Sequence, residues 1–149
     1  MDLKNEDIVE LFFDVNRLNR RFSEKFYGSM TPFKGQYRCL FALDSVGSIN
    51  QKDLAELLSI RPTSVSEILL KLEQKQLIKR VTSDKDKRIS LVSLTDKGIK
   101  EVHKIRKDRA RVHSEMLSDL TEDEKTYLFI ALQKMKNYYI SKEEKMSNE

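Results

Sequence analysis

Residues 50–95 read NQKDLAELLSIRPTSVSEILLKLEQKQLIKRVTSDKDKRISLVSLT, and this stretch decides the fold of the chain. In residues 51–58, and again from Pro62 onward, apolar side chains recur three and four positions apart. This spacing predicts two short helices joined by a tight turn. Asn50 is suited to cap the first helix, with Asp53 placed for a reciprocal cap.

The second part of the stretch predicts a β-hairpin. Residues 77–82 and 89–94 are rich in Val, Ile and Thr, and they flank the charged segment 83–88. This composition is typical of two strands joined by a polar tip. Ile49 is positioned to add a short third strand beside the hairpin.

The helix pair has the spacing of a helix-turn-helix. Ala55 is small where the helices must cross, Ser59 falls in the turn, and Val65 packs between the helices. Glycine is the usual turn residue, so Ser59 departs from the pattern and has to adopt the turn at some conformational cost. Taken alone, the pair fits a DNA-binding unit and an ordinary helical hairpin equally well. The basic hairpin that follows favours a winged helix-turn-helix.

The rest of the chain is predicted to be helical. A Phe-rich stripe predicts a helix over residues 5–27. Thr31-Pro32 is a helix-entry signal for a second helix that ends near Ser45, although Gly35 leaves the start of this helix open. Thr95 is suited to cap a long helix over residues 96–118, and Thr121–Glu124 forms a capping box that opens the last helix. The polar residues 141–149 are expected to fray. The predicted fold class is mainly α with a small β-hairpin wing.

Composition limits the classes of function. The chain has 149 residues, a net charge of +4 and a single cysteine, Cys39, which excludes an internal disulfide. Between Lys79 and Arg111 there are 12 basic and 5 acidic residues, which is the charge excess expected of a phosphate-binding face. The longest apolar run, residues 39–43, is too short to cross a bilayer. We therefore expect a cytoplasmic protein with no membrane partner.

Catalytic and metal-binding patterns are missing from the sequence. There is no nucleophile elbow, phosphate loop or paired catalytic His/Asp motif, which points away from an enzyme. His103 and His113 point in different directions on a helix. With one cysteine in the chain, we expect no metal site of the His/Cys type and no cofactor.

Several segments together resemble the MarR family of bacterial and archaeal transcriptional regulators. They are Gln36-Tyr37-Arg38, residues 51–58 and 63–72, Leu77-Ile78-Lys79-Arg80, the Asp86-Lys87-Arg88 tip and the Ser93-Leu94-Thr95-Asp96-Lys97-Gly98 exit. The tip and the exit are the more particular of these motifs, and the resemblance covers nearly the whole chain. It implies a single MarR-like domain over residues 1–149 that works as a homodimer. Residues 31–95 would form the winged helix-turn-helix lobe, residues 1–30 and 96–140 the dimerisation helices, and residues 141–149 a polar tail.

The resemblance also implies the function and the partners. It predicts a sequence-specific DNA-binding regulator, in most cases a repressor that a small molecule or an oxidant releases from a pseudo-palindromic double-stranded operator. The helix matching residues 62–74 would enter the major groove, and Arg88 the minor groove. A winged-helix module that binds proteins and not DNA is the alternative.

The candidate site residues fall into four groups. The recognition helix contributes polar and basic residues near its start: Arg61, Pro62, Thr63, Ser64, Ser66, Glu67 and Lys71. The wing contributes its tip, which would otherwise be a solvated loop: Lys85, Asp86, Lys87 and Arg88. Dimerisation would use apolar residues of both terminal helices, unless these close a bundle within one chain: Ile8, Leu11, Phe12, Val15, Leu128, Leu132, Met135 and Tyr139. Aromatic residues that could line an effector cavity, or could be simple core, are Phe12, Phe22, Tyr37 and Phe41.

Cys39 allows two interpretations. Its position between Arg38 and Leu40 favours a small buried hydrophobic residue. A neighbouring arginine can instead lower the pKa of a thiol, which would suit a redox switch.

Overall fold

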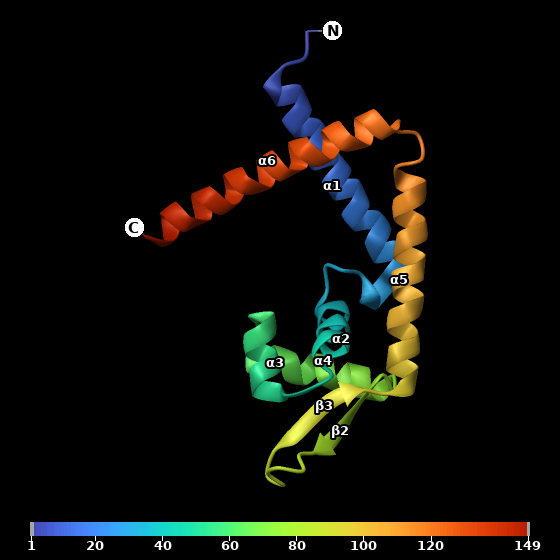
Figure 1. Ribbon diagram of the computed structural model, residues 1–149, viewed down its shortest axis with the longest axis vertical. Helices are drawn as coiled ribbons and strands as arrows, with labels where there is room; N and C mark the ends of the chain where they lie inside the picture. The colour runs from blue at the N-terminus through green and yellow to red at the C-terminus, as the bar shows by residue number, and fades with distance from the viewer. Residues whose placement is uncertain (1, 149) are drawn as a thin grey trace. The chain divides into compact units, whose positions relative to one another are not determined.

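The computed structural model describes residues 2–148, and its chain divides into two compact units, Met1–Lys104 and Ile105–Glu149. Helix α5 (Asp96–Met116) begins in the first unit and ends in the second, where α6 (Glu122–Ser147) follows. The remaining elements belong to the first unit (Figure 1): α1 (Asn5–Tyr27), the 3-10 turn η1 (Gly28–Met30), α2 (Gly35–Val46), β1 (Ser48–Asn50), α3 (Gln51–Leu58), α4 (Pro62–Gln74), β2 (Ile78–Thr82) and β3 (Ser90–Leu94). The prediction of a mainly helical fold with a small hairpin is confirmed.

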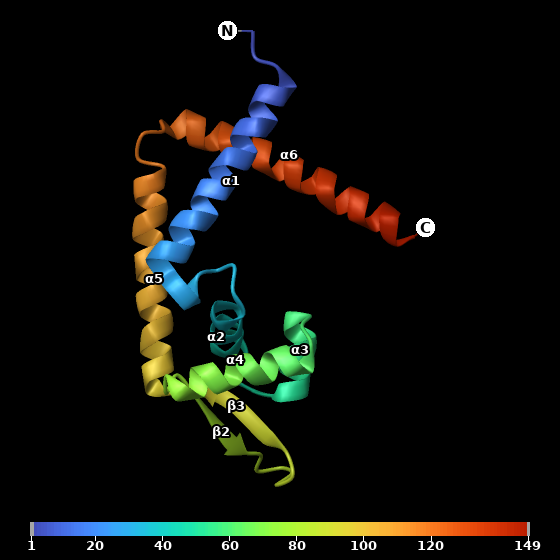
Figure 2. The same cartoon turned by 180° about the vertical axis from the view of Figure 1, so that it is seen from behind.

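The sheet is antiparallel and three-stranded, in the order β1-β3-β2. Val92 in the central strand lies opposite Ile49 on one side and Arg80 on the other, so the predicted short strand at Ile49 is present. The two long strands project from the first unit beyond α4, as both views in Figures 1 and 2 show. A hairpin placed in this way presents its tip to the surroundings.

One apolar core holds α2, α3, α4 and the sheet together. Its fully buried large side chains come from each of these elements: Leu40, Leu43, Leu54, Val65, Leu69, Leu72 and Val92. Ala55 and Val65 are both buried, as the helix-turn-helix spacing predicted. Leu57 of α3 lies outside this core and is 53% exposed.

The start of α2 differs from the prediction. Thr31 and Pro32 do not open the helix, which begins at Gly35 after the extended residue Lys34. The backbone N–H of Lys34 donates to the Thr31 carbonyl at 3.0 Å, so these residues form a turn. Thr31 is fully buried, and its extended backbone ends η1. The entry signal at Thr31-Pro32 was wrong, and the helix begins at Gly35, where the sequence had left its start open.

The chain meets itself where the hairpin joins α5. The Thr95 backbone N–H donates to the Leu77 carbonyl at 3.0 Å, and the Thr95 hydroxyl donates to the Gln76 carbonyl at 2.6 Å. The same hydroxyl accepts from the Gly98 N–H at 3.0 Å, which is the predicted cap of α5. A Cβ at position 98 would collide with the Leu77 carbonyl oxygen. The close approach of the two backbones therefore requires glycine at this position.

Replacing Gly98 by alanine tests this contact. We expect Gly98→Ala to lower the free energy of unfolding by about 2 kcal/mol, because overpacking against rigid backbone outweighs the better helix propensity of alanine. Urea denaturation followed by circular dichroism measures the change. Lys100→Ala, on an exposed position of the same helix, is the control. Equal stability of the two variants would contradict the predicted collision.

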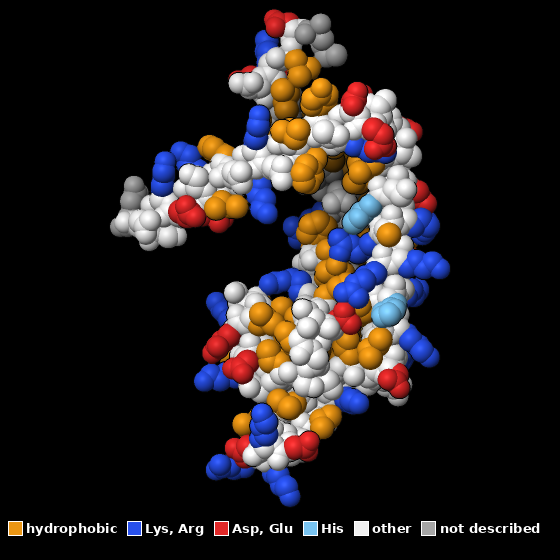
Figure 3. All heavy atoms as spheres, viewed as in Figure 1, with side chains coloured by type: hydrophobic (Ala, Val, Ile, Leu, Met, Phe, Trp, Pro, Cys, Tyr) orange, Lys and Arg blue, Asp and Glu red, His pale blue; other side chains and the backbone are white. Residues whose placement is uncertain are grey.

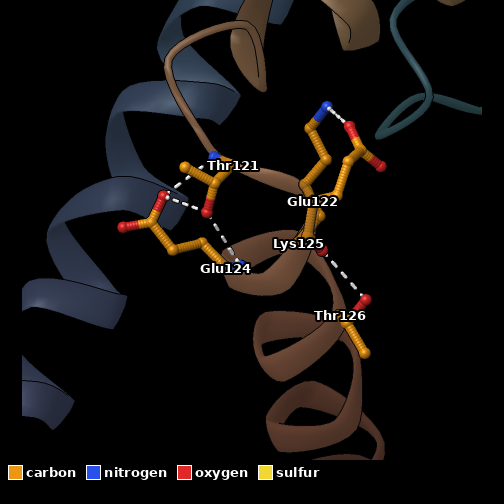
Figure 4. Close-up of polar contacts among 5 residues, drawn as sticks. All are labelled: Thr121, Glu122, Glu124, Lys125 and Thr126. Carbon is orange, nitrogen blue, oxygen red and sulfur yellow. Dashed lines mark hydrogen bonds and ion pairs between the residues drawn. The ribbon is translucent and has the colours of Figure 1, made fainter.

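In the second unit, a capping box begins α6 (Figure 4). The Thr121 hydroxyl accepts from the Glu124 backbone N–H at 3.3 Å, and the Glu124 carboxylate accepts from the Thr121 backbone N–H at 2.8 Å. The backbone and hydroxyl hydrogen bonds from Thr121 lower the pKa of Glu124. This local signal was correctly predicted from the sequence.

The prediction of a frayed tail is wrong, because α6 continues to Ser147. The segment 141–147 contains no Gly or Pro, and most of its residues are good helix formers that extend the helix before it. Glu149 lies outside the described residues.

Helices α1 and α6 each carry large apolar side chains that remain exposed in the isolated chain. Ser23 is the one buried residue of α1, and none of α6 is buried. Figure 3 shows apolar side chains gathered along both helices. Among the predicted dimerisation residues, Leu11 is 64% exposed, Val15 52% and Tyr139 52%. Ile8, Leu128 and Leu132 are exposed as well, and Phe12 and Met135 are half-buried.

Candidate nucleic-acid interface

Side-chain hydrogen bonds stabilise both ends of α3, and the turn to α4 follows its second end. Asn50 caps α3, since its side chain accepts from the Asp53 N–H at 2.9 Å and donates to the Asp53 carboxylate at 2.7 Å. Ser59 adopts the left-handed conformation at φ 53°, which is the strained turn expected of a residue standing where glycine is usual. The guanidinium of Arg38 donates to the Leu58 carbonyl at 2.7 Å and so stabilises the end of α3.

Helix α4 has an apolar face in the core and a polar face in solvent. Val65, Leu69 and Leu72 are fully buried. Most of the residues predicted to contact DNA from the recognition helix are exposed: Arg61, Pro62, Thr63, Ser66, Glu67 and Lys71. Ser64 is half-buried and therefore turns partly away from that surface. The structure thus exposes six of these seven side chains, five of them near the start of α4 and Lys71 in its last turn.

Ser66 accepts a hydrogen bond from a residue that was not among the predicted site residues. The Gln51 amide donates to the Ser66 hydroxyl at 2.6 Å, and Arg80 donates to the Gln51 amide oxygen at 3.1 Å. Glu73 accepts from Arg80 at 2.6 Å, in an ion pair whose side chains are 36–38% exposed. These four side chains come from α3, α4 and β2, so no local spacing in the sequence could have revealed them.

The wing tip carries an exposed arginine that is paired with Asp86. The Asp86 carboxylate accepts from the Arg88 backbone N–H at 3.0 Å and from its Nε at 3.2 Å. Both hydrogen bonds lower the pKa of the Asp86 carboxyl, and the bond from the Arg88 backbone has the larger effect. The Arg88 side chain is nevertheless 91% exposed. Lys85 and Lys87 are exposed beside it, and Figure 3 shows basic and acidic side chains together around the hairpin tip.

Lys75 joins the end of α4 to the segment that follows α1. Its ammonium donates to the Ser29 hydroxyl at 2.8 Å and to the Gln36 amide oxygen at 2.7 Å. Its own carbonyl accepts from the Lys97 ammonium at 3.0 Å. Hydrogen bonds of side chains therefore connect the end of α4 to η1, α2 and α5 within the first unit.

Each of the four predicted effector residues packs its ring against another aromatic ring. Tyr37 stacks on Phe41 with ring centroids 4.2 Å apart, whereas Phe22 stacks on Phe26 at 5.4 Å. Phe12 contacts its neighbour Phe13 at 5.9 Å. An effector cavity lined by these side chains therefore remains a prediction.

Cys39 has the environment of a buried hydrophobic residue. Its side chain is fully buried, and loss of hydration raises the pKa of its thiol to about 12. Arg38 does not offset this effect, because its guanidinium reaches the Leu58 carbonyl instead. A raised pKa keeps the group in its neutral, weakly nucleophilic form at physiological pH.

We therefore expect Cys39 to resist alkylation in the folded protein. Iodoacetamide at pH 8 should leave the native chain unmodified and should label it fully in denaturant, as mass spectrometry would show. A rate in the native state close to that of a free thiol would contradict the burial of Cys39.

Among residues 2–148, no group of three or more His, Cys, Asp or Glu side chains is placed to hold a metal ion. The described helices also include none with the length and apolar character needed to cross a membrane.

A helix pair whose second member exposes a polar face, followed by a hairpin with an exposed arginine at its tip, defines a winged helix-turn-helix protein. The sequence model of the MarR family matches residues 34–90, which span this arrangement. The predicted resemblance to the MarR family is thus confirmed.

Individual relatives agree with this assignment. The chain is 28% identical over 129 residues to the uncharacterized HTH-type transcriptional regulator YdgJ of Bacillus subtilis, covering 87% of this chain and 79% of YdgJ. It is 36% identical over 95 residues to the HTH-type transcriptional repressor MdtR of the same organism, covering 64% of this chain and 60% of MdtR.

Solved structures of S. aureus MepR are also similar. One mutant of MepR superposes with a TM-score of 0.78 at 25% identity, covering 88% of this chain and 97% of that one. A second mutant, solved bound to an oligodeoxyribonucleotide, gives a TM-score of 0.68 at 25% identity, covering 89% and 97%.

Proposed function

We propose that this chain is a sequence-specific DNA-binding transcriptional regulator that acts as a homodimer. The observation that carries the proposal is the exposed polar face of α4 beside a hairpin whose exposed Arg88 is paired with Asp86. The MepR relative bound to an oligodeoxyribonucleotide supports DNA as the partner.

Each part of the interface has a separate task. Arg61 and Lys71 flank the exposed face of α4 and contact phosphates, which supplies affinity through counterion release. Thr63, Ser64 and Ser66 lie near base edges. Glu67 is placed to accept from the amino group of cytosine.

The wing completes the contact with DNA. Arg88 enters the minor groove, where narrow A·T-rich tracts have an enhanced negative potential. Lys85 and Lys87 follow the adjacent phosphates. The bonds from Asp86 restrict the rotamers of Arg88 before binding, so less side-chain entropy is lost when DNA binds.

A second copy of the chain covers the exposed apolar faces of α1 and α6. Large apolar side chains line both helices, and burying them against a partner stabilises the assembly. In this organisation residues 1–30 and 96–140 form the dimer region and residues 31–95 the reading lobe. Two-fold symmetry then sets the two copies of α4 about 34–36 Å apart on a pseudo-palindromic operator.

We further propose that the protein is a cytoplasmic repressor without enzymatic activity, released from DNA by a small molecule. The relative MdtR is named a repressor, which supports the direction of control. The burial of Cys39 disfavours an oxidant acting on this thiol, so a bound effector is the version that the chain supports better.

A gel-shift titration on an operator selected from genomic fragments tests the proposal. We expect Arg88→Ala to weaken operator binding at least tenfold, because it removes a charged contact in the minor groove, about 1.4 kcal/mol or more. Size-exclusion chromatography should show an unchanged dimer, because Arg88 lies at the wing tip.

Lys142→Ala removes one positive charge from α6, outside the reading lobe, and is the control. Operator binding by Arg88→Ala at the wild-type level would remove the wing from the mechanism.

A protein-binding winged helix remains the second candidate. It is favoured by Leu57 on α3 and Leu70 on α4, which are 53% and 57% exposed within the reading lobe. Salt dependence separates the two functions. A DNA-binding protein loses affinity steeply between about 50 and 200 mM salt, whereas absence of DNA binding at low salt would support the alternative.

The dimer has its own test. Leu11→Glu places a charge on the exposed apolar stripe of α1 and should shift the protein towards a monomer, as measured by size-exclusion chromatography with light scattering. Arg17→Glu introduces the same side chain on the polar side of α1 and should leave the dimer intact. Two variants of equal mass in solution would count against α1 as a dimer helix.

A further inference from the structure

We infer that Ser66 reads DNA only as a hydrogen-bond acceptor, and that Gln51 and Arg80 are the positioning residues that restrict it to this role. The inference rests on the proposed function, since it specifies how one residue of the reading face selects a base. It assigns to Ser66 a preference for a base that presents an amino group in the major groove.

The contacts form one continuous relay across three elements. Arg80 of β2 donates to the Glu73 carboxylate at 2.6 Å and to the Gln51 amide oxygen at 3.1 Å. Gln51 of α3 donates from its amide nitrogen to the Ser66 hydroxyl at 2.6 Å. Ser66 of α4 donates in turn to the Pro62 carbonyl at 3.1 Å.

The groups at the two ends fix the direction of this relay. A guanidinium can only donate, so the oxygen of the Gln51 amide must face Arg80 and its nitrogen must face Ser66. A backbone carbonyl can only accept, so the single hydroxyl proton of Ser66 must point to Pro62. Reversing any one bond would leave two donors or two acceptors facing each other.

The relay leaves Ser66 with one hydrogen-bonding position. A hydroxyl has one proton and two acceptor lone pairs. The hydroxyl proton of Ser66 is donated to the Pro62 carbonyl, and one lone pair of the hydroxyl oxygen accepts from the Gln51 amide. The residue is exposed, so the second lone pair is open to solvent and to a ligand. Ser66 can thus accept one hydrogen bond from DNA but has no proton to donate.

A hydroxyl that can only accept hydrogen bonds distinguishes between bases. In the major groove, adenine presents the N6 amino group and cytosine the N4 amino group, whereas guanine and thymine present keto oxygens. An acceptor-only hydroxyl bonds the amino groups and faces a keto oxygen without a proton between them. The Pro62 carbonyl accepts the hydroxyl proton, and Gln51, oriented by Arg80, keeps the Ser66 oxygen in the rotamer that reaches Pro62. A serine free to leave this rotamer would serve either type of base, so the selectivity depends on Gln51 and Arg80 through the position of Ser66.

The test begins with selection of DNA sequences from a random pool by the wild-type protein, followed by titration of single-base variants of the selected site. At one position in each half-site we expect adenine or cytosine to be preferred about threefold to tenfold, the range for one net hydrogen bond. Ser66→Ala should abolish that preference. Ser66→Thr, which keeps the hydroxyl and can also bond the carbonyl four residues before it, should retain it.

A second variant separates positioning from direct contact. Gln51→Leu removes the hydrogen bond that keeps the Ser66 oxygen beside the Pro62 carbonyl. The side chain can then turn about its Cα–Cβ bond, leave Pro62 and donate its proton to DNA, so the same position should accept guanine or thymine nearly as well. Glu56→Leu puts the same side chain at an exposed position of α3 outside the relay and should keep the wild-type preference. Thermal unfolding of each variant verifies that the lobe is folded, and base preference is a readout that a purely structural role would not change.

The outcomes distinguish the two levels of the argument. If the wild-type protein enriches no sequence, the proposed function fails. If it enriches a site but Ser66→Ala keeps every base preference, or if the preference lost is for guanine or thymine, the inference alone is overturned. It is also overturned if Gln51→Leu keeps the full preference at the position that depends on Ser66.

Discussion

The close backbone contact between Leu77 and the segment from Thr95 to Gly98 is the constraint on which the rest of the first unit depends. At this point the end of α4, the base of the hairpin and the start of α5 share hydrogen bonds through the Leu77 and Gln76 carbonyls. Because both strands of the hairpin begin or end here, their direction relative to α4 is fixed at the base. The base of the hairpin therefore has a set position relative to the exposed face of α4. A protein whose helix and wing contact adjacent grooves of DNA needs such a set position.

Features determined by residues close in sequence were predictable. The Asn50 cap, the capping box at Thr121 and the Asp86–Arg88 pair each join residues two or three positions apart, so that spacing and residue type are sufficient. The left-handed turn at Ser59 followed from the helix-turn-helix spacing even though the residue is not glycine. The helical core of the lobe followed from apolar periodicity.

Features determined by distant residues were not predictable. Gln51 and Ser66 are 15 positions apart, and Gln51 and Arg80 are 29 apart, so only the crossing of the elements brings them together. The state of Cys39 depends on burial, which the adjacent Arg38 in the sequence did not reveal. Thr31-Pro32 was misassigned because a local entry signal competes with the turn before it. The tail was misassigned because polar composition alone does not end a helix.

The Lys75 contacts have a mechanical consequence. Ser29 follows α1 directly, and Lys75 stands at the end of α4, so two hydrogen bonds of 2.7 and 2.8 Å form a short path for force between these helices. Such bonds fail beyond about 3.5 Å, so they follow a movement of Ser29 only as far as the flexible four-carbon stem of Lys75 can reach. A larger displacement at the end of α1 must either break this tie or pull the end of α4 with it. The recognition helix is thus coupled to strain on α1 before any ligand is considered.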